Sequence, residues 1–136
     1  MRILALDHGS ARCGCAICDP TETIVSPLSA VERPDSEAGR AAIAELVARE
    51  GVEHVVVGLP RLASGEEGAQ AAAARSFAGR LGAQLAVPLD LYDERFTTRM
   101  ARESIGHGAS ADEDSLAAAH LLEEYLRVRA GRGDAA

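Results

Sequence analysis

Residues 2–18 read RILALDHGSARCGCAIC and contain the pattern that decides the fold. The run at 2–7 is almost continuously apolar, has the length of a strand, and ends on a carboxylate, Asp7. A short polar turn leads to a second strand-like run at 13–18, and an Asp-Pro pair then initiates a turn toward a third run at 24–31. Three strands joined by such short connections predict an antiparallel meander.

Helices and strands alternate in the rest of the chain. Helices are predicted over 36–49, over 66–82 with Glu66 and Glu67 in the first turn, over 98–104, and from a capping box at Ser110 to about Arg129. Strands are predicted over 54–58 and over 85–92. Pro88 places the second of these strands at or near a sheet edge. The expected fold class is a three-layer α/β domain with a mixed sheet. It would occupy residues 1–129, followed by a flexible tail over 130–136.

Composition narrows the possible functions. The chain has 136 residues, with 21 acidic against 14 basic side chains and a formal net charge of −7. Every basic residue is an arginine, so any phosphate contacts must come from guanidinium groups, and the acidic balance argues against a diffuse basic coat for nucleic acid. No apolar run approaches the ~20 residues of a membrane span, and charge at Asp7 interrupts any signal-peptide core. A cytoplasmic protein without membrane contact is expected.

Three cysteines, at 13, 15 and 18, lie close together in the second predicted strand. A zinc site would need four ligands in a tetrahedral array, which requires a loop at this position. A strand instead places Cys13 and Cys15 on one face, where small thiols pack well. Packing in the core is therefore the favoured interpretation.

Carboxylates at the ends of predicted strands and at the start of the last helix form a candidate site. Asp7 ends the first strand, and Asp93-Glu94 closes another, where at most one of the pair can face Asp7. Asp114 leads the face of the last helix that should be buried, although it could simply favour the helix dipole. Carboxylates that converge at a sheet edge suit Mg²⁺ or Mn²⁺, which can support phosphodiester hydrolysis.

Other side chains near these carboxylates leave alternatives open. Arg95, Arg99 and Arg102 fall at helical spacing and could form either a phosphate-binding stripe or a solvated helix face. His8 adjoins Asp7 and could relay a proton or support the site from outside it, whereas His120 is expected at the surface. The chain has no Walker lysine, which excludes a P-loop.

Four ordered blocks resemble a known family. DHGSARCGCAICD at 7–19, VVVGLP at 55–60 with the SGEEG that follows, YDERFTT at 92–98 and DEDSLAAAHLLEEYL at 112–126 resemble the YqgF family of RNase H-like proteins, also called RuvX. Members of that family are described as Holliday junction resolvases or pre-16S ribosomal RNA nucleases. The resemblance implies a five-stranded RNase H-like fold whose first three strands are antiparallel.

The resemblance also implies site residues. The catalytic, metal-binding carboxylates would be Asp7, Glu94 and Asp114, with Asp93 as the second choice for the middle position. Relatives tend to carry basic residues just before the last aspartate, whereas Gly106 to Glu113 is acidic here, so some expected phosphate contacts are lost. The central strand ends on Gly-Leu-Pro without the acid that many RNase H-like nucleases have there.

The leading hypothesis is a cytoplasmic Mg²⁺- or Mn²⁺-dependent nuclease acting on structured nucleic acid, foremost the 5′ end of pre-16S rRNA in ribosome biogenesis. Arg12, Arg95 and Arg99 would contact phosphates. The alternatives are a resolvase of branched DNA and a non-catalytic nucleic-acid-binding factor in ribosome assembly or transcription. The D-x-G-S loop also fits the phosphate turn of sugar kinases and actin-like ATPases, but those need two such domains. Monomer and homodimer both remain open.

Overall fold

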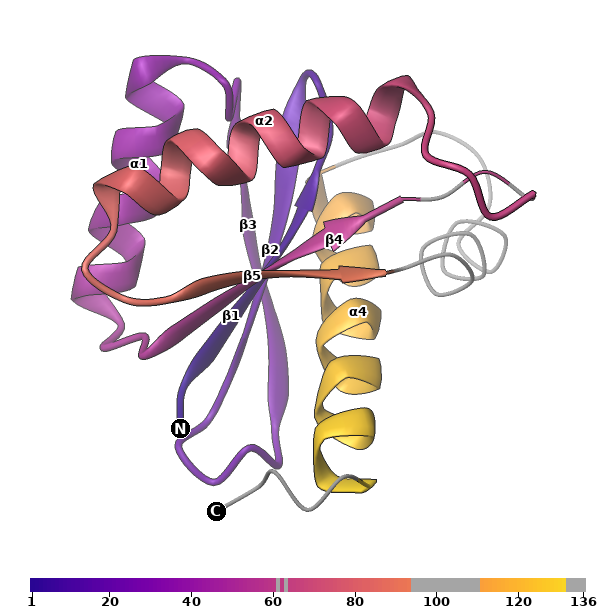
Figure 1. Cartoon of the computed structure of the whole chain (residues 1–136). Helices are drawn as coiled ribbons and strands as arrows, with labels where there is room; N and C mark the ends of the chain where they lie inside the picture. The colour runs from indigo at the N-terminus through magenta and orange to yellow at the C-terminus, as the bar shows by residue number, and fades with distance from the viewer. Residues whose placement is uncertain (61, 63, 94–110, 132–136) are drawn as a thin grey trace.

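The computed structural model describes residues 1–60, 62, 64–93 and 111–131 (Figure 1). Its elements are β1 (Ile3–His8), β2 (Arg12–Cys18), β3 (Val25–Glu32), α1 (Glu37–Arg49), β4 (His54–Leu59), α2 (Ala69–Gln84), β5 (Leu89–Asp93) and α4 (Ala111–Gly131). The helix predicted over 98–104, the capping box at Ser110 and residues 132–136 of the predicted tail lie outside the described residues, whereas Ala130 and Gly131, predicted as tail, belong to α4. No helix in the described ranges is long and apolar enough to cross a membrane.

The five strands form one mixed sheet in the order β3-β2-β1-β4-β5. β1, β2 and β3 pair antiparallel, which confirms the predicted meander, and β4 pairs parallel to both β1 and β5. The first turn of the meander is tight, because the N–H of Gly9 donates to the carbonyl of Arg12 at 2.9 Å. In the second turn, hydrogen bonds from the Thr21 hydroxyl and then from backbone N–H groups hold the pKa of Asp19 well below its usual value.

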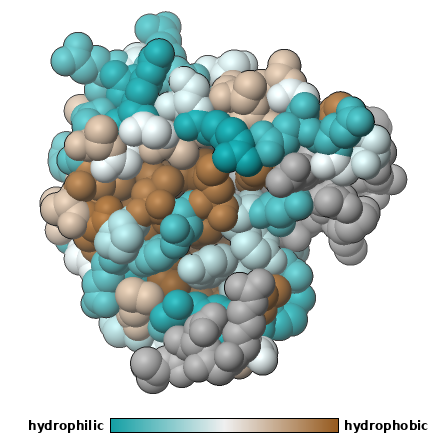
Figure 2. Space-filling view, in the orientation of Figure 1, coloured by the Kyte–Doolittle hydropathy of each residue, from teal (hydrophilic) through white to brown (hydrophobic). Residues whose placement is uncertain are grey.

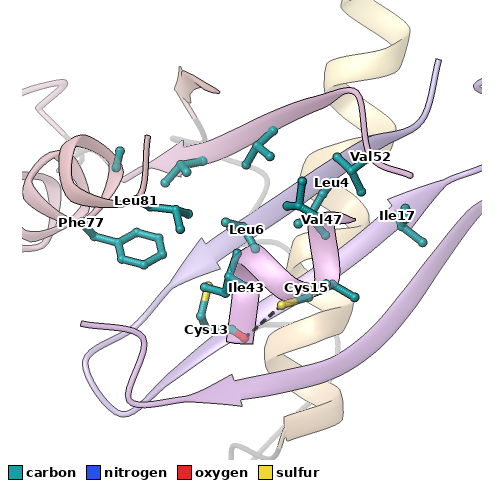
Figure 3. Packing of buried hydrophobic residues seen from close by; sticks show 14 residues of the cluster. Leu4, Leu6, Cys13, Cys15, Ile17, Ile43, Val47, Val52, Phe77 and Leu81 are labelled. Atoms are coloured by element: carbon teal, nitrogen blue, oxygen red, sulfur yellow. Dashed lines mark hydrogen bonds between the residues drawn. The ribbon is translucent and has the colours of Figure 1, made fainter. Parts of the chain in front are cut away.

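Helices cover both faces of the sheet (Figure 1). α1 and α2 cover one face, where side chains from alternate positions of β1 and β2 form a core with Phe77 and Leu81 (Figure 3). α4 covers the other face, where Ile3, Ala5 and Ala16 pack against it. Figure 2 shows the same side of the molecule, with apolar residues gathered between hydrophilic residues above and below. The predicted three-layer α/β class is confirmed.

The cysteines pack as predicted. All three are free and buried, Cys13 and Cys15 on the α1/α2 face and Cys18 on the α4 face. The Cys15 thiol donates to the carbonyl of Cys13 at 3.6 Å, the contact drawn as a dashed line in Figure 3.

Two element boundaries differ from the predictions in ways that matter for the site. β1 continues one residue past Asp7, because His8 still pairs with Cys13, so Asp7 lies inside the strand. β5 begins only at Leu89: Pro88 has no N–H for the ladder, and its carbonyl accepts from Val55 N at 3.0 Å. β5 is an edge strand, as Pro88 indicated.

The start of α2 was predicted three residues too early. The helix begins at Ala69 and has no acidic residue in its first turn. Glu67 instead accepts two hydrogen bonds from the Arg75 guanidinium, each 2.6 Å long. Helical spacing also predicts Gln70 and Ala73 on the buried face with Phe77, whereas the structure buries Ala71 and Ala78 there. Gln70 and Ala73 are therefore exposed near the amino end of α2.

Candidate active site

Asp7 is a buried carboxylate near the carboxyl end of the central strand of the sheet. It is 4% exposed and occupies the last position but one of β1. Its side chain follows Ile3 and Ala5 in the two-residue alternation of the strand, so it points toward α4. Burying an ionised carboxylate is costly unless donors, a counter-charge or a metal ion compensate it. The Asp7 carboxylate therefore needs hydrogen-bond donors or positive charge on the α4 face of the sheet.

Gly14 provides the space in which α4 approaches Asp7. It pairs with Asp7 across β1 and β2, and a Cβ atom placed on Gly14 would lie 2.0 Å from the backbone oxygen of Asp114. Only a glycine lets the first turns of α4 come this close to the sheet. The close approach brings Asp7 and Asp114, which are 107 positions apart in the sequence, to the same place.

Ser115 joins α4 to β2 at this point through a hydrogen bond. Its side chain is buried, and its hydroxyl accepts the backbone N–H of Cys15 at 3.3 Å. The register of β2 against β3 shifts between Cys13 and Cys15, so this hydrogen bond lies at an irregular position of the ladder. Neither Gly14 nor Ser115 was predicted from the sequence as part of the site. A glycine inside a strand pattern was the available signal, because it often marks a close approach of backbones.

The Asp114 carboxylate is held by Arg12. The Nε of Arg12 donates to Oδ2 of Asp114 at 2.9 Å, and the two side chains are 34% and 23% exposed. Arg12 begins β2 and shares the α4 face with Gly14. The residue proposed as a phosphate contact thus also orients a proposed metal ligand.

The electrostatics of β2 agree with this arrangement. A hydrogen bond with Cys15, followed by burial, raises the pKa of the Cys13 thiol well above its usual value. The negative charges of Asp7 and Asp114 add to the shift. The thiol therefore stays protonated on the α1/α2 face of the sheet and adds no charge near the two carboxylates.

The third carboxylate falls partly outside the described residues. Asp93 ends β5, where Leu91 packs on the α1/α2 face and Tyr92 packs on the α4 face. The alternation places Asp93 on the face away from Asp7. Glu94 is thereby the candidate that remains; it, Arg95 and Arg99 lie outside the described residues.

The donor set suits a hard divalent cation. Carboxylate oxygens are the preferred ligands of Mg²⁺ and Mn²⁺. Within the described ranges no group of three or more His, Cys, Asp or Glu side chains could hold a metal. Asp7 and Asp114 fit such an ion as two ligands, and a complete site requires a third from elsewhere, for which Glu94 is the candidate.

The two histidines considered for the site, His8 and His120, lie in different surroundings. His8 points away from Asp7, because consecutive residues of β1 face opposite sides of the sheet. Its Nε2 lies 3.0 Å from Oδ2 of Asp35, and its ring stacks on Phe77 with centroids 4.6 Å apart. His120 lies at the surface of α4, 46% exposed, as expected.

The sheet order and the helical layers define a protein of RNase H-like fold. Two solved structures share it: T. thermophilus RuvC in complex with a Holliday junction substrate, with a TM-score of 0.59, 19% identity and 96% of each chain covered, and the fowlpox virus Holliday junction resolvase, with a TM-score of 0.54, 13% identity and coverage of 94% and 99%. At these identities the likeness concerns the fold.

The chain belongs to the RuvX family. The family's sequence model, described as Holliday junction resolvase, matches residues 1–128. A relative from Chloroflexus aggregans is 41% identical, with 93% of this chain and 94% of that protein covered, and one from Moorella thermoacetica is 39% identical with the same coverage. Both carry the name "Putative pre-16S rRNA nuclease". The resemblance seen in the four sequence blocks is confirmed.

Proposed function

We propose that this protein is a metal-dependent nuclease that hydrolyses phosphodiester bonds in structured nucleic acid, and that its substrate is the 5′ end of pre-16S rRNA. Membership of the RuvX family and the names of its relatives support nuclease activity and this substrate. Processing of a ribosomal RNA precursor would place the protein in the cytoplasm.

The close approach of α4 to β2 at Gly14 is the observation that carries the metal-dependent mechanism. It sets Asp114 beside Asp7, where Arg12 holds one oxygen of Asp114 and a divalent cation would add a counter-charge for the pair. Asp7, Asp114 and Glu94 would hold Mg²⁺ or Mn²⁺. The bound ion would activate water and neutralise the leaving oxygen.

The surrounding residues would orient the carboxylates and position the substrate. Burial of Asp7 keeps its carboxylate in one orientation, and Arg12 holds one oxygen of Asp114. The hydrogen bond from Arg12 thereby also fixes the orientation of the other carboxylate oxygen of Asp114. Arg12, Arg95 and Arg99 would contact phosphates around the scissile bond.

The test is cleavage of a pre-16S rRNA fragment with and without Mn²⁺. We expect the wild-type protein to cleave only with the metal, and Asp7→Asn or Asp114→Asn to lower the rate at least ~100-fold. Asp90→Asn provides a matched control, because Asp90 is an exposed β5 carboxylate beside His54 and belongs to no proposed site. Full cleavage by both site variants would overturn the mechanism.

Branched DNA is a second candidate substrate, which the family description favours. A four-way junction assayed in parallel distinguishes the two substrates. Cutting a junction symmetrically needs two sites related by a two-fold axis, so a resolvase would sediment as a dimer, whereas end trimming needs one site. A factor that only binds would retain RNA affinity in both aspartate variants and show no metal-dependent product.

A further inference from the structure

A small pocket opens on the side of β1 opposite to Asp7. Its volume is about 240 Å³, and it is lined by His8, Gly9, Ser10, Asp35, Ala69, Gln70 and Ala73. His8 directly follows Asp7 in β1, so the pocket begins one residue from the proposed catalytic carboxylate. It lies at the same carboxyl end of the strand but on the α1/α2 face. The residues of this "His8 pocket" have no role in the proposed hydrolysis.

Two residues of the His8 pocket, His8 and Asp35, are held in place by contacts within the protein. The side chain of His8 is only 4% exposed, stacked on Phe77 and bonded to both carboxylate oxygens of Asp35, at 3.1 and 3.0 Å. The backbone carbonyl of Asp35 accepts from Arg40 Nη1 at 2.5 Å. A preformed pocket loses little entropy when a ligand enters.

The chemistry of the lining favours a base over a phosphate. Asp35 is 49% exposed, so its carboxylate oxygens can still accept hydrogen bonds from a ligand. Ser10 and Gln70 add a hydroxyl and an amide, whereas none of the described lining residues is an arginine. A phosphate would meet the negative charge of Asp35, whereas the Arg40 guanidinium is bound to the Asp35 backbone carbonyl and to Gln84 and does not line the pocket. A base that carries an amino group would instead donate to the carboxylate.

The size of the His8 pocket agrees with a single base. Pockets for drug-sized ligands measure about 300–1,000 Å³, and this one is smaller, at about 240 Å³. Proteins that read RNA sequence commonly take unpaired bases into such pockets and bind their edges through hydrogen bonds. Because His8 of the lining directly follows Asp7 in β1, a nucleic-acid strand that crosses this end of the sheet at Asp7 would run next to the pocket.

We propose that the His8 pocket binds one unpaired nucleobase of the substrate strand and prefers bases with an amino group, such as cytosine, over uracil. The proposal rests on the proposed function in assuming a nucleic-acid strand at Asp7. It makes Asp35 and Gln70 specificity-determining residues that take no part in the chemistry.

Binding measured without cleavage tests the pocket directly. Fluorescence anisotropy of labelled oligocytidine and oligouridine is recorded in EDTA, with wild-type protein and three variants. Ala73→Phe fills the pocket, and Ala72→Phe puts the same ring on the adjacent exposed position of α2, outside the lining. Asp35→Asn keeps the shape and changes the acceptor. Circular dichroism confirms that each variant is folded.

We expect the wild-type protein and Ala72→Phe to bind oligocytidine about tenfold more tightly than oligouridine. Ala73→Phe and Asp35→Asn should lose this preference. Equal binding of the two oligonucleotides by wild type, or a preference that survives Ala73→Phe, overturns the proposal. If Ala73→Phe weakens both oligonucleotides equally, the pocket takes the backbone and the base assignment is wrong.

The outcome is separable from that of the proposed function. Asp7→Asn should abolish cleavage and keep the preference for cytidine, because Asp7 lies on the other face of the sheet. A preference found in a protein that cleaves nothing would support the pocket and contradict the nuclease. Cleavage without base preference would do the reverse.

Discussion

Gly14 decides where the second carboxylate lies. It stands opposite Asp7 in the sheet and has the backbone of Asp114 where a side chain would begin. Neither residue is near the other in the sequence, and no periodicity of the last helix reveals the contact. A single hydrogen atom in place of a methyl group is the condition for bringing Asp7 and Asp114 together.

Gly14→Ala should destabilise the fold and displace Asp114. A Cβ at 2.0 Å from a backbone oxygen must move α4 or β2, which we expect to cost about 1–3 kcal/mol in the free energy of unfolding. Urea denaturation measures the change. Gly79→Ala is the matched control, since nothing lies within 4 Å of its Cβ in α2 and the variant should gain about 0.5–1 kcal/mol. Equal stability of the two variants would contradict the close approach.

We expect Arg12 to have opposing effects on metal binding and on cleavage, because it pairs with Asp114. Arg12→Met removes a positive charge and a donor from Asp114, so we expect Mn²⁺ to bind about fivefold more tightly in titration calorimetry. Cleavage should fall, because Asp114 is no longer oriented. Arg12→Lys keeps the charge and should leave Mn²⁺ affinity near that of wild type. Weaker Mn²⁺ binding in Arg12→Met would show that the ion pair does not compete with the metal.

At the level of elements, the docking of α4 depends on a hydrogen bond from the sheet. α4 has its buried residues on one face, as its spacing predicted, and these residues alone do not determine how far along the sheet it sits. The N–H of Cys15 lies at the irregular point of β2 and donates to Ser115. Together with the close approach of Asp114 to Gly14, that contact joins the first turns of α4 to β2 at a defined position.

Ser115→Ala should leave the N–H of Cys15 buried without an acceptor. An unsatisfied buried donor costs about 1–3 kcal/mol, which urea denaturation would detect. Hydrogen exchange at the Cys15 amide should accelerate as well. Ser36→Ala is a useful comparison, because it removes the N-cap of α1, where Ser36 Oγ accepts from Gly39 N at 2.9 Å, and should cost about 1 kcal/mol without changing exchange at Cys15. An unchanged hydrogen-exchange rate at the Cys15 amide in Ser115→Ala would show that Ser115 does not hold α4 to β2.

Considered as a whole molecule, the acidic surplus is unevenly distributed along the chain. Residues 21–50 hold six acidic residues against three arginines and residues 101–136 hold seven against four, whereas residues 51–100 hold six against five. Asp7, Glu94 and Asp114 count among the acidic residues that bound cations would offset. Such a molecule is suited to a few directed phosphate contacts.

Salt dependence of RNA binding tests this property of the whole surface. Three arginine contacts predict that log Kobs falls against log[salt] with a slope of about −2 for single-stranded RNA. Anisotropy titrations between low and physiological KCl, in EDTA, measure the slope. A slope beyond about −5 would indicate a diffuse basic surface and contradict the arrangement inferred from composition.

The sequence by itself determined the five strands, the helices α1 and α4 and the order of the meander, and it supplied the proposed carboxylates, because strand alternation, helical spacing and turn residues act over a few positions. It placed the start of α2 wrongly, since Glu66 and Glu67 resemble a first helical turn that the chain does not form. Only the tertiary structure decided that Asp114 sits beside Asp7, that Arg12 holds it, and that a pocket lies behind His8. These features depend on contacts between residues far apart in the chain, and such contacts exist only once α1, α2 and α4 have packed on the sheet.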